Sequence, residues 1–190
     1  MSIDGWQVRD LIEVSQYRII YCKTIAMYPK TAGMRAFDTV APVDQFYKNI
    51  NSALFSDSLL ITGNLLDQKY DNTISLKNWF KPNTKQKDLQ IIVDLFKSCG
   101  LKEVRDQVFG HQDVGNHNNA FPFSRLQGEL NIELIEKLED IQKRISDLFF
   151  SYAKEHEENK YGFINTQEAY NEIQTTMQNA KPTLTNSHVI

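Results

Sequence analysis

Three side chains in the stretch EVRDQVFGHQD, residues 103–113, could act together on a phosphate ester. Arg105 carries a permanent positive charge and can hold a phosphate through paired hydrogen bonds. The imidazole of His111 can accept or donate a proton near neutral pH. Asp106 could orient these groups or tune their charge. The stretch therefore combines a cation, a carboxylate and a proton carrier, which is enough for acid–base chemistry on a phosphodiester.

The spacing of this motif does not by itself bring the cation and the imidazole together. Each helical residue advances about 100°, so Arg105 and His111 would be offset by about 240° on a regular helix. They could meet if the helix distorts or ends near Gly110, or if two copies of the helix cross in a dimer. Gly110 favours such an irregularity, because glycine costs up to about 1 kcal/mol against alanine inside a helix.

RNA is a substrate that such a site could cleave without a metal, because the RNA 2′-hydroxyl is the nucleophile. A base near the 2′-oxygen, an acid near the leaving 5′-oxygen and a cation on the phosphate are sufficient. A cleft between two chains would supply two imidazoles for the two proton transfers. A His at the C-terminal end of a helix is also ordinary in proteins without activity, so the spacing alone leaves both interpretations open.

The stretch VRDQVFGHQD resembles the signature of the HEPN superfamily (higher eukaryotes and prokaryotes nucleotide-binding). That signature has an Arg, usually followed by a polar residue, with four to six residues in all between the Arg and a His; Arg105, Asp106 and His111 match it. The resemblance is closest to the branch related to the abortive-infection U proteins. There the motif commonly reads Arg-Asp-Lys, two residues, Ala-His, one residue, Asp.

This chain departs from that branch at two positions and agrees with it elsewhere. Gln107 replaces the Lys and Gly110 replaces the Ala, whereas Asp113 is kept. A second stretch, NLLDQKYDNTISLKNWF, resembles the element of the same branch that reads Leu-Leu/Phe-Asp, a short polar spacer and Ser-Leu. The residues that match this element are Asp67, Ser75 and Leu76. The resemblance covers roughly residues 5–160.

The resemblance implies an antiparallel four-to-five-helix bundle, metal-independent endoribonuclease activity, and a homodimer in which two motifs line one cleft. Arg105 would hold the scissile phosphate, His111 would be the general acid or base, and Asp106 would support them. No metal or other cofactor is expected. The expected partners are RNA, a second copy of the chain and an antitoxin or another phage-defence protein. Further contacts to the RNA are assigned to Lys102, Gln107 and Asp113.

A non-catalytic helical module is the alternative, because some members of the superfamily bind nucleotides or act in assembly. Such a module would dock a partner through the apolar seam at 134–152 or through residues 81–105, which carry six basic and three acidic residues. A metal site at His111, Asp113 and His117 fits no shared helix face. Trp79 and Phe80 could stack on bases, but such a pair more often fills a core.

Helices must position these residues, because glycine and proline are few and strand-like alternation is absent, so the fold class is all-α. The clearest helix has apolar residues four, three, four, three and four apart over 134–152, a pattern typical of bundle cores or partner helices. Ser75 is a predicted helix N-cap and Gly100 a C-cap. The other predicted helices cover residues 4–27, 43–68, 81–100 and 166–180.

The first two of these helices have predicted core faces. We expect Pro29 to end the first helix and Gly63 to weaken the second locally. In the first helix the predicted apolar stripe is Trp6, Leu11, Val14, Tyr21 and Ile25, widened by Ile12 and Ile19. In the second helix it is Phe46, Ile50, Ala53, Leu54, Ile61 and Leu65.

Length and composition predict one domain, with 41% hydrophobic residues among 190. We expect a helical bundle over residues 1–165, a short helix over 166–180 and a disordered tail over 181–190. No apolar run is long enough for a membrane span and no leader is evident, so we expect a soluble, cytoplasmic protein. Cys22 and Cys99 are expected to be buried free thiols.

Overall fold

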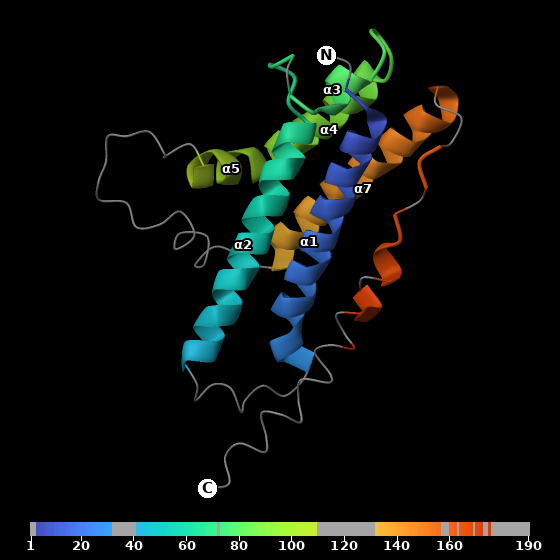
Figure 1. Cartoon of the computed structure of the whole chain (residues 1–190). Helices are drawn as coiled ribbons and strands as arrows, with labels where there is room; N and C mark the ends of the chain where they lie inside the picture. Colours follow the sequence, from blue (N-terminus) through green and yellow to red (C-terminus); the bar gives the residue numbers. More distant parts are fainter. Residues whose placement is uncertain are drawn as a thin grey trace, which may run out of the picture.

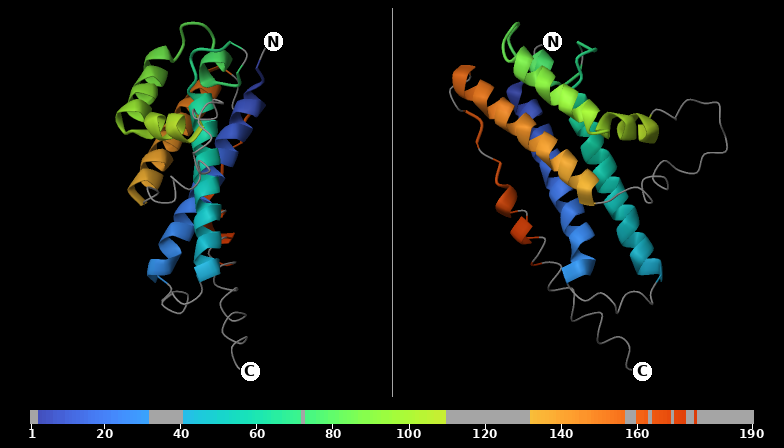
Figure 2. Two further views of the ribbon diagram at one scale, coloured as in Figure 1. Left: turned by 90° about the vertical axis from the view of Figure 1, so that its left-hand side faces the viewer. Right: turned by 180° about the vertical axis from the view of Figure 1, so that it is seen from behind.

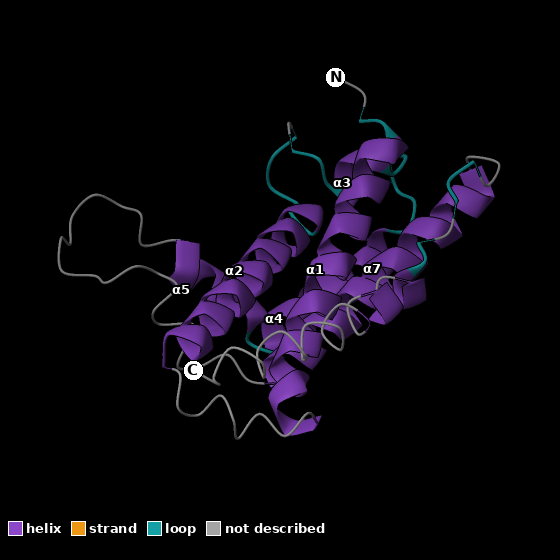
Figure 3. Cartoon of the chain, turned by 60° about the horizontal axis from the view of Figure 1, so that its bottom comes forward, coloured by secondary structure: helices purple, strands orange, loops and turns teal. Residues whose placement is uncertain are grey.

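A computed structural model describes residues 3–31, 41–71, 73–109, 132–156, 160–162, 164–168, 170–172 and 175; for 27–31, 41–48 and 107–109 it describes the backbone alone. These residues form helices, turns and loops, with no strand among them, and the all-α prediction is confirmed (Figure 3). No helix in this part of the chain is long and apolar enough to span a membrane. The helices are α1 Gly5–Thr31, α2 Ala41–Leu65, α3 Leu76–Trp79, α4 Gln86–Ser98, α5 Leu101–Phe109 and α7 Ile132–His156 (Figure 1).

The two long N-terminal helices lie side by side and antiparallel, and α7 packs across them (Figures 1 and 2). The helix α4 covers α7, whereas α5 turns away from α4 and contacts α2. The predicted seam of the last long helix faces this interior: Leu138, Ile141 and Ile145 are at most 1% exposed. The interpretation of the 134–152 seam as an intramolecular core is therefore confirmed, and it is not a free surface for a partner helix.

A capping box starts α1. The Asp4 carboxylate accepts a hydrogen bond from the Trp6 backbone N–H at 3.2 Å, and the Gln7 side chain accepts one from the Asp4 N–H at 3.4 Å. The prediction that Pro29 ends this helix is wrong, because α1 continues to Thr31. Proline removes one N–H and crowds the preceding turn, but its fixed φ is helical, so a final turn can include it.

The predicted apolar stripes of α1 and α2 are partly wrong. Trp6 and Val14 are 42% and 39% exposed, while Ile12 and Ile19, which the sequence placed at the edge of the stripe, are buried. In α2 the predicted Ala53 is exposed. The buried face of α2 instead combines apolar and hydroxyl side chains, namely Ser52, Phe55, Ser56, Ser58, Leu59 and Thr62.

Two of these hydroxyl groups, those of Ser58 and Thr62, bond to helix backbone, whereas the buried Ser52 Oγ and Ser56 Oγ have no hydrogen-bond partner among the described residues. Thr62 Oγ1 donates to the Ser58 carbonyl at 2.8 Å, and Ser58 Oγ donates to the Ser15 carbonyl of α1 at 2.9 Å. Gln142 of α7 then donates to both hydroxyl oxygens, to Thr62 at 3.1 Å. One α7 side chain thus ties into the polar contact between the first two helices, which apolar periodicity alone does not reveal.

An aromatic cluster closes one end of the fold. Trp79, which follows the Ser75 N-cap of α3, stacks on Phe149 of α7 at 4.6 Å between ring centroids. Phe80 is also buried, so the core interpretation of Trp79 and Phe80 is confirmed. Tyr161 belongs to residues 160–162, here called the C-terminal strap, and its ring lies 5.3 Å from Phe149 and 6.0 Å from Trp79.

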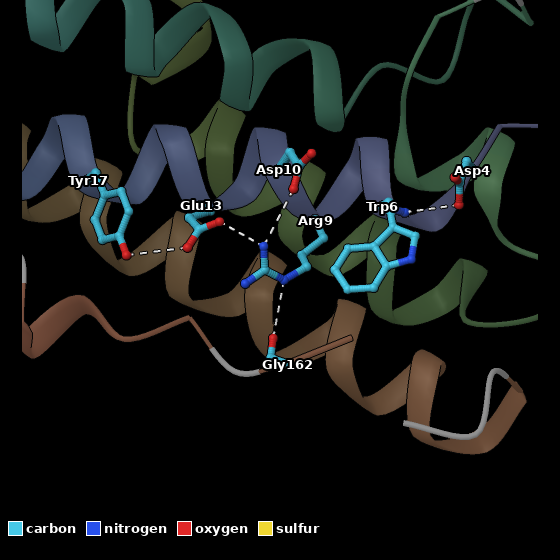
Figure 4. Close-up of polar contacts among 7 residues, drawn as sticks. All are labelled: Asp4, Trp6, Arg9, Asp10, Glu13, Tyr17 and Gly162. Atoms are coloured by element: carbon cyan, nitrogen blue, oxygen red, sulfur yellow. Dashed lines mark hydrogen bonds and ion pairs between the residues drawn. The ribbon is translucent and has the colours of Figure 1, made fainter. Parts of the chain in front are cut away.

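Polar contacts along α1 hold the same strap. Arg9 Nε donates to the Gly162 carbonyl at 3.2 Å, and Arg9 Nη1 donates to Glu13 at 2.7 Å (Figure 4). Tyr17 in turn donates to Glu13 at 3.3 Å. Burial and then the Glu13 carboxylate raise the pKa of Tyr17. Beyond the strap, residues 166–168, 170–172 and 175 are helical, within the predicted 166–180 helix.

The turn between α4 and α5 sets the direction of the motif helix. Gly100 has φ +84°, a left-handed conformation that glycine adopts without a steric penalty. Its N–H donates to the Lys97 carbonyl at 3.0 Å, and its carbonyl accepts from the Val104 N–H at 3.1 Å. The predicted C-cap is therefore present and also starts the next helix. Because the chain turns at Gly100, α5 reaches α2 and carries the motif residues with it.

Candidate functional site

Three charged side chains of α5 form one cluster, here called the α5 triad: Lys102, Arg105 and Asp106. Lys102 Nζ donates to Asp106 Oδ2 at 2.5 Å, the pairing that residues four apart on a helix allow. Arg105 donates to the other carboxylate oxygen, Oδ1, from Nε at 3.0 Å and from Nη2 at 2.7 Å. Both oxygens of one carboxylate are thus engaged by two cations.

The electrostatics of the triad favour an ionised carboxylate and leave a positive excess. Burial alone would raise the pKa of Asp106, but hydrogen bonds and charge attraction from Lys102 and Arg105 together hold that pKa below its ordinary value. Two cations against one carboxylate leave one positive charge. Side-chain exposures of 40% for Lys102 and 29% for Arg105 place this charge within reach of solvent. The triad can therefore attract an anion.

Arg105 keeps donors available for such an anion. A guanidinium has five N–H donors, and two of them are used on Asp106. Among the described residues, Nη1 donates no hydrogen bond. On the side of Cδ and Nη1, Arg105 lies against Gly63 of α2, where the missing side chain leaves room for the guanidinium. Sequence reasoning missed Gly63 as a site residue, because its only sequence signal is a glycine inside a helix.

The remaining predicted site residues are only partly covered by the structure. Gln107 belongs to α5, but its side chain lies outside the described atoms. His111 and Asp113 lie outside the described residues, as does His117 of the alternative metal site. The approach of His111 to Arg105 therefore remains a prediction. No group of three or more His, Cys, Asp or Glu side chains within the described ranges could hold a metal.

The basic segment 81–105 presents less free charge than its composition suggests. Lys85 bonds to Glu155 of α7 at 2.7 Å, and Lys97 lies 3.7 Å from Asp94. The Lys85 contact lowers the pKa of Glu155, the hydrogen bond being the largest cause. These cations stabilise contacts within the chain, so the positive excess of the α5 triad is the more specific feature of the segment.

An open groove of about 300 Å³ lies between α4 and α7, and its lining includes the apolar side chains of Leu95 and Ile141. The lining also includes the acidic residues Glu133, Glu136 and Asp140. Each carboxylate has a cation nearby, at 2.7 Å from Lys137, 3.9 Å from Lys23 and 2.8 Å from Arg144, respectively. Lys23 also pairs with Glu139 at 2.5 Å, so carboxylates are in excess here and the groove, unlike the α5 triad, does not favour an anion.

The cysteine predictions are confirmed in part. Both thiols are free, and Cys22 is fully buried, but Cys99 is only half-buried at the groove. Burial raises the pKa of the Cys22 thiol to about 12, so it is not a nucleophile at neutral pH.

Comparison of the chain with protein-family models, with curated proteins and with solved structures found no match.

Proposed function

We propose that this chain is a metal-independent endoribonuclease of the HEPN type that acts in phage defence or in a toxin–antitoxin system. The observation that carries the proposal is the geometry of Arg105. Its guanidinium is fixed by Asp106, partly exposed, and has unused N–H donors beside a second cation, Lys102. Such a group can bind a phosphodiester and stabilise the charge that develops on phosphorus.

The reaction would be an internal transesterification. The 2′-oxygen of the RNA attacks phosphorus, the bond from phosphorus to the 5′-oxygen breaks, and a 2′,3′-cyclic phosphate and a 5′-hydroxyl are formed. His111 removes the 2′-hydroxyl proton or donates a proton to the 5′-oxygen, and the second imidazole comes from the other subunit of a homodimer. Arg105 compensates the added negative charge, while Asp106 keeps the guanidinium oriented.

The all-α fold and the surface position of α5 support this proposal. A site on α5 can face a second copy, because the helix projects from the α1–α2–α7 core rather than lying inside it (Figure 2). Gly110 follows directly after the described end of α5 at Phe109, where the sequence predicts an irregularity. A HEPN-like bundle and a homodimer are parts of the proposal.

The test is cleavage of a defined single-stranded RNA with and without EDTA, combined with the mass of the protein in solution. We expect EDTA-resistant cleavage, cyclic phosphate ends and a dimer. His111→Ala and Arg105→Ala should each lower the rate at least about 100-fold, within the range for loss of a general acid–base or charge-stabilising group. Lys143→Ala, at an exposed position of α7, is the matched control for loss of a cation and should keep the rate.

Unchanged cleavage by correctly folded His111→Ala protein would refute the assigned roles. A purified chain that cleaves none of the RNAs in EDTA would instead favour the non-catalytic module. That alternative can no longer use the 134–152 seam, whose main residues are buried.

A further inference from the structure

The contact between Gly63 and Arg105 is closer than any side chain at position 63 would permit. A Cβ atom built on Gly63 would lie 2.7 Å from Arg105 Cδ and 2.8 Å from Nη1. Both distances are shorter than real Cβ contacts, so even alanine would overlap the Arg105 side chain. The guanidinium therefore rests directly on the backbone of α2.

Backbone conformation does not explain the glycine. Among the described glycines, Gly100 has a positive φ, whereas Gly63 lies inside the regular helix α2. Glycine is less favourable than alanine in a helix interior, because it loses more backbone freedom on folding. Glycine at position 63 therefore makes α2 less stable than alanine would, but it leaves space for the Arg105 side chain.

Arg105 is consequently held from two sides by two different elements. Asp106 of α5 fixes Nε and Nη2 through hydrogen bonds, and the α2 backbone at Gly63 lies against Cδ and Nη1. A carboxylate alone would allow the flexible side chain to rotate toward solvent. The contact with the α2 backbone at Gly63 reduces that freedom. A side chain held in one orientation is what a preorganised phosphate-binding group requires.

We propose that Gly63 is a positioning residue for Arg105: by lacking a side chain, it seats the guanidinium on α2 in the orientation that receives the scissile phosphate. This inference rests on the proposed function and adds a residue from outside the motif, forty-two positions before Arg105. In Gly63→Ala, the methyl group displaces the long Arg105 side chain and leaves the α2 backbone in place, because the side chain is the softer partner.

The experiment compares wild type, Gly63→Ala, Arg105→Ala and the double variant through two readouts. The first is the Asp106 carboxyl titrated by NMR. Gly63→Ala should raise the pKa of Asp106 toward its value in Arg105→Ala, because the hydrogen bonds from Arg105 are lost. In the Arg105→Ala background, Gly63→Ala should leave that pKa unchanged. Gly162→Ala is the matched control, since a Cβ there meets no atom within 4 Å.

The second readout is cleavage of the same defined RNA. Gly63→Ala should lower kcat about 100-fold, the loss typical of a misplaced catalytic group, with a smaller change in KM and no fall in the urea unfolding midpoint. A loss of stability in step with activity would indicate a merely structural glycine and overturn the inference. An unchanged Asp106 pKa in Gly63→Ala would overturn it as well.

The two proposals fail in different ways. If the wild type cleaves RNA and Gly63→Ala cleaves it equally well, only the role of Gly63 is refuted. If the wild type does not cleave RNA but Gly63→Ala still raises the Asp106 pKa, the ribonuclease proposal is refuted and the contact is reduced to packing, which also overturns the positioning role.

Discussion

Replacing Tyr161 by alanine tests whether the C-terminal strap is part of the cooperative core. The Tyr161 side chain is 5% exposed and its ring lies 5.0 Å from Trp6 and 5.3 Å from Phe149. A Cβ at Gly5 would overlap the Tyr161 hydroxyl, so the start of α1 also fits closely around this ring. The variant would therefore remove an aromatic side chain that touches three separate parts of the chain.

The expected cost follows from the buried area and the order of the strap. A buried aromatic side chain covers roughly 200 Å², and at about 25 cal/mol per Å² its removal costs about 5 kcal/mol. Release of about two residues of the strap returns backbone freedom worth about 1 kcal/mol each, or roughly 2 kcal/mol. We therefore expect Tyr161→Ala to lower the free energy of unfolding by about 3 kcal/mol, which corresponds to a fall in Tm of roughly 6–12 °C for a domain of this size.

Urea unfolding followed by circular dichroism measures this change, and Tyr70→Ala is the matched control. The Tyr70 side chain is 64% exposed, so its loss should change the free energy of unfolding by no more than about 0.5 kcal/mol. A cost below about 1 kcal/mol for Tyr161→Ala would show that the strap detaches independently. The aromatic cluster would then be complete without it, contrary to the packing argument.

Two further predictions concern buried polar groups and thiols. Gln142→Met removes a buried Oε1 that has no hydrogen-bond partner, and it also removes the two hydrogen bonds that Nε2 donates to Ser58 and Thr62. Because these effects oppose each other at about 1 kcal/mol each, Gln142→Met should change stability by less than about 1 kcal/mol, whereas Gln142→Ala should cost about 2–4 kcal/mol through its cavity. Equal urea midpoints for the two variants would contradict this. At pH 8, a thiol reagent should modify Cys99 in the native protein, and Cys22 only after denaturation, because burial raises the Cys22 pKa to about 12. Mass spectrometry of the labelled peptides distinguishes the two sites.

Local signals in the sequence predicted the elements well. The N-cap role of Ser75 and the C-cap role of Gly100 depend on hydrogen bonds within a few residues, and both are present. The seam at 134–152 is regular because α7 buries a continuous apolar face, with Leu138 and Tyr152 each at most 1% exposed. Features whose determinants all lie within one short stretch could therefore be predicted from the residues of that stretch.

Features that depend on distant contacts were not predictable in this way. The predicted core face of α2 differs from the observed one because Ser52, Ser56 and Ser58 are buried. A search for apolar periodicity treats serine as an exterior residue and therefore misses them. The α5 triad follows from helical spacing, but Gly63 comes from another helix and enters the site only through the fold. Nothing within α5 indicates which helix its arginine will rest on.

The late position of α7 in the chain bears on how the protein folds during synthesis. Ile12 of α1 and Phe55 of α2 belong to the same buried cluster as Leu138 of α7. Because α7 starts at Ile132, a ribosome adding 5–20 residues per second needs roughly 3–13 s to reach it after completing α2. During that interval the nascent pair of helices keeps apolar surface in water, where chaperones can bind it. The helices α1 and α2 can therefore complete their native packing only after α7 has been synthesised.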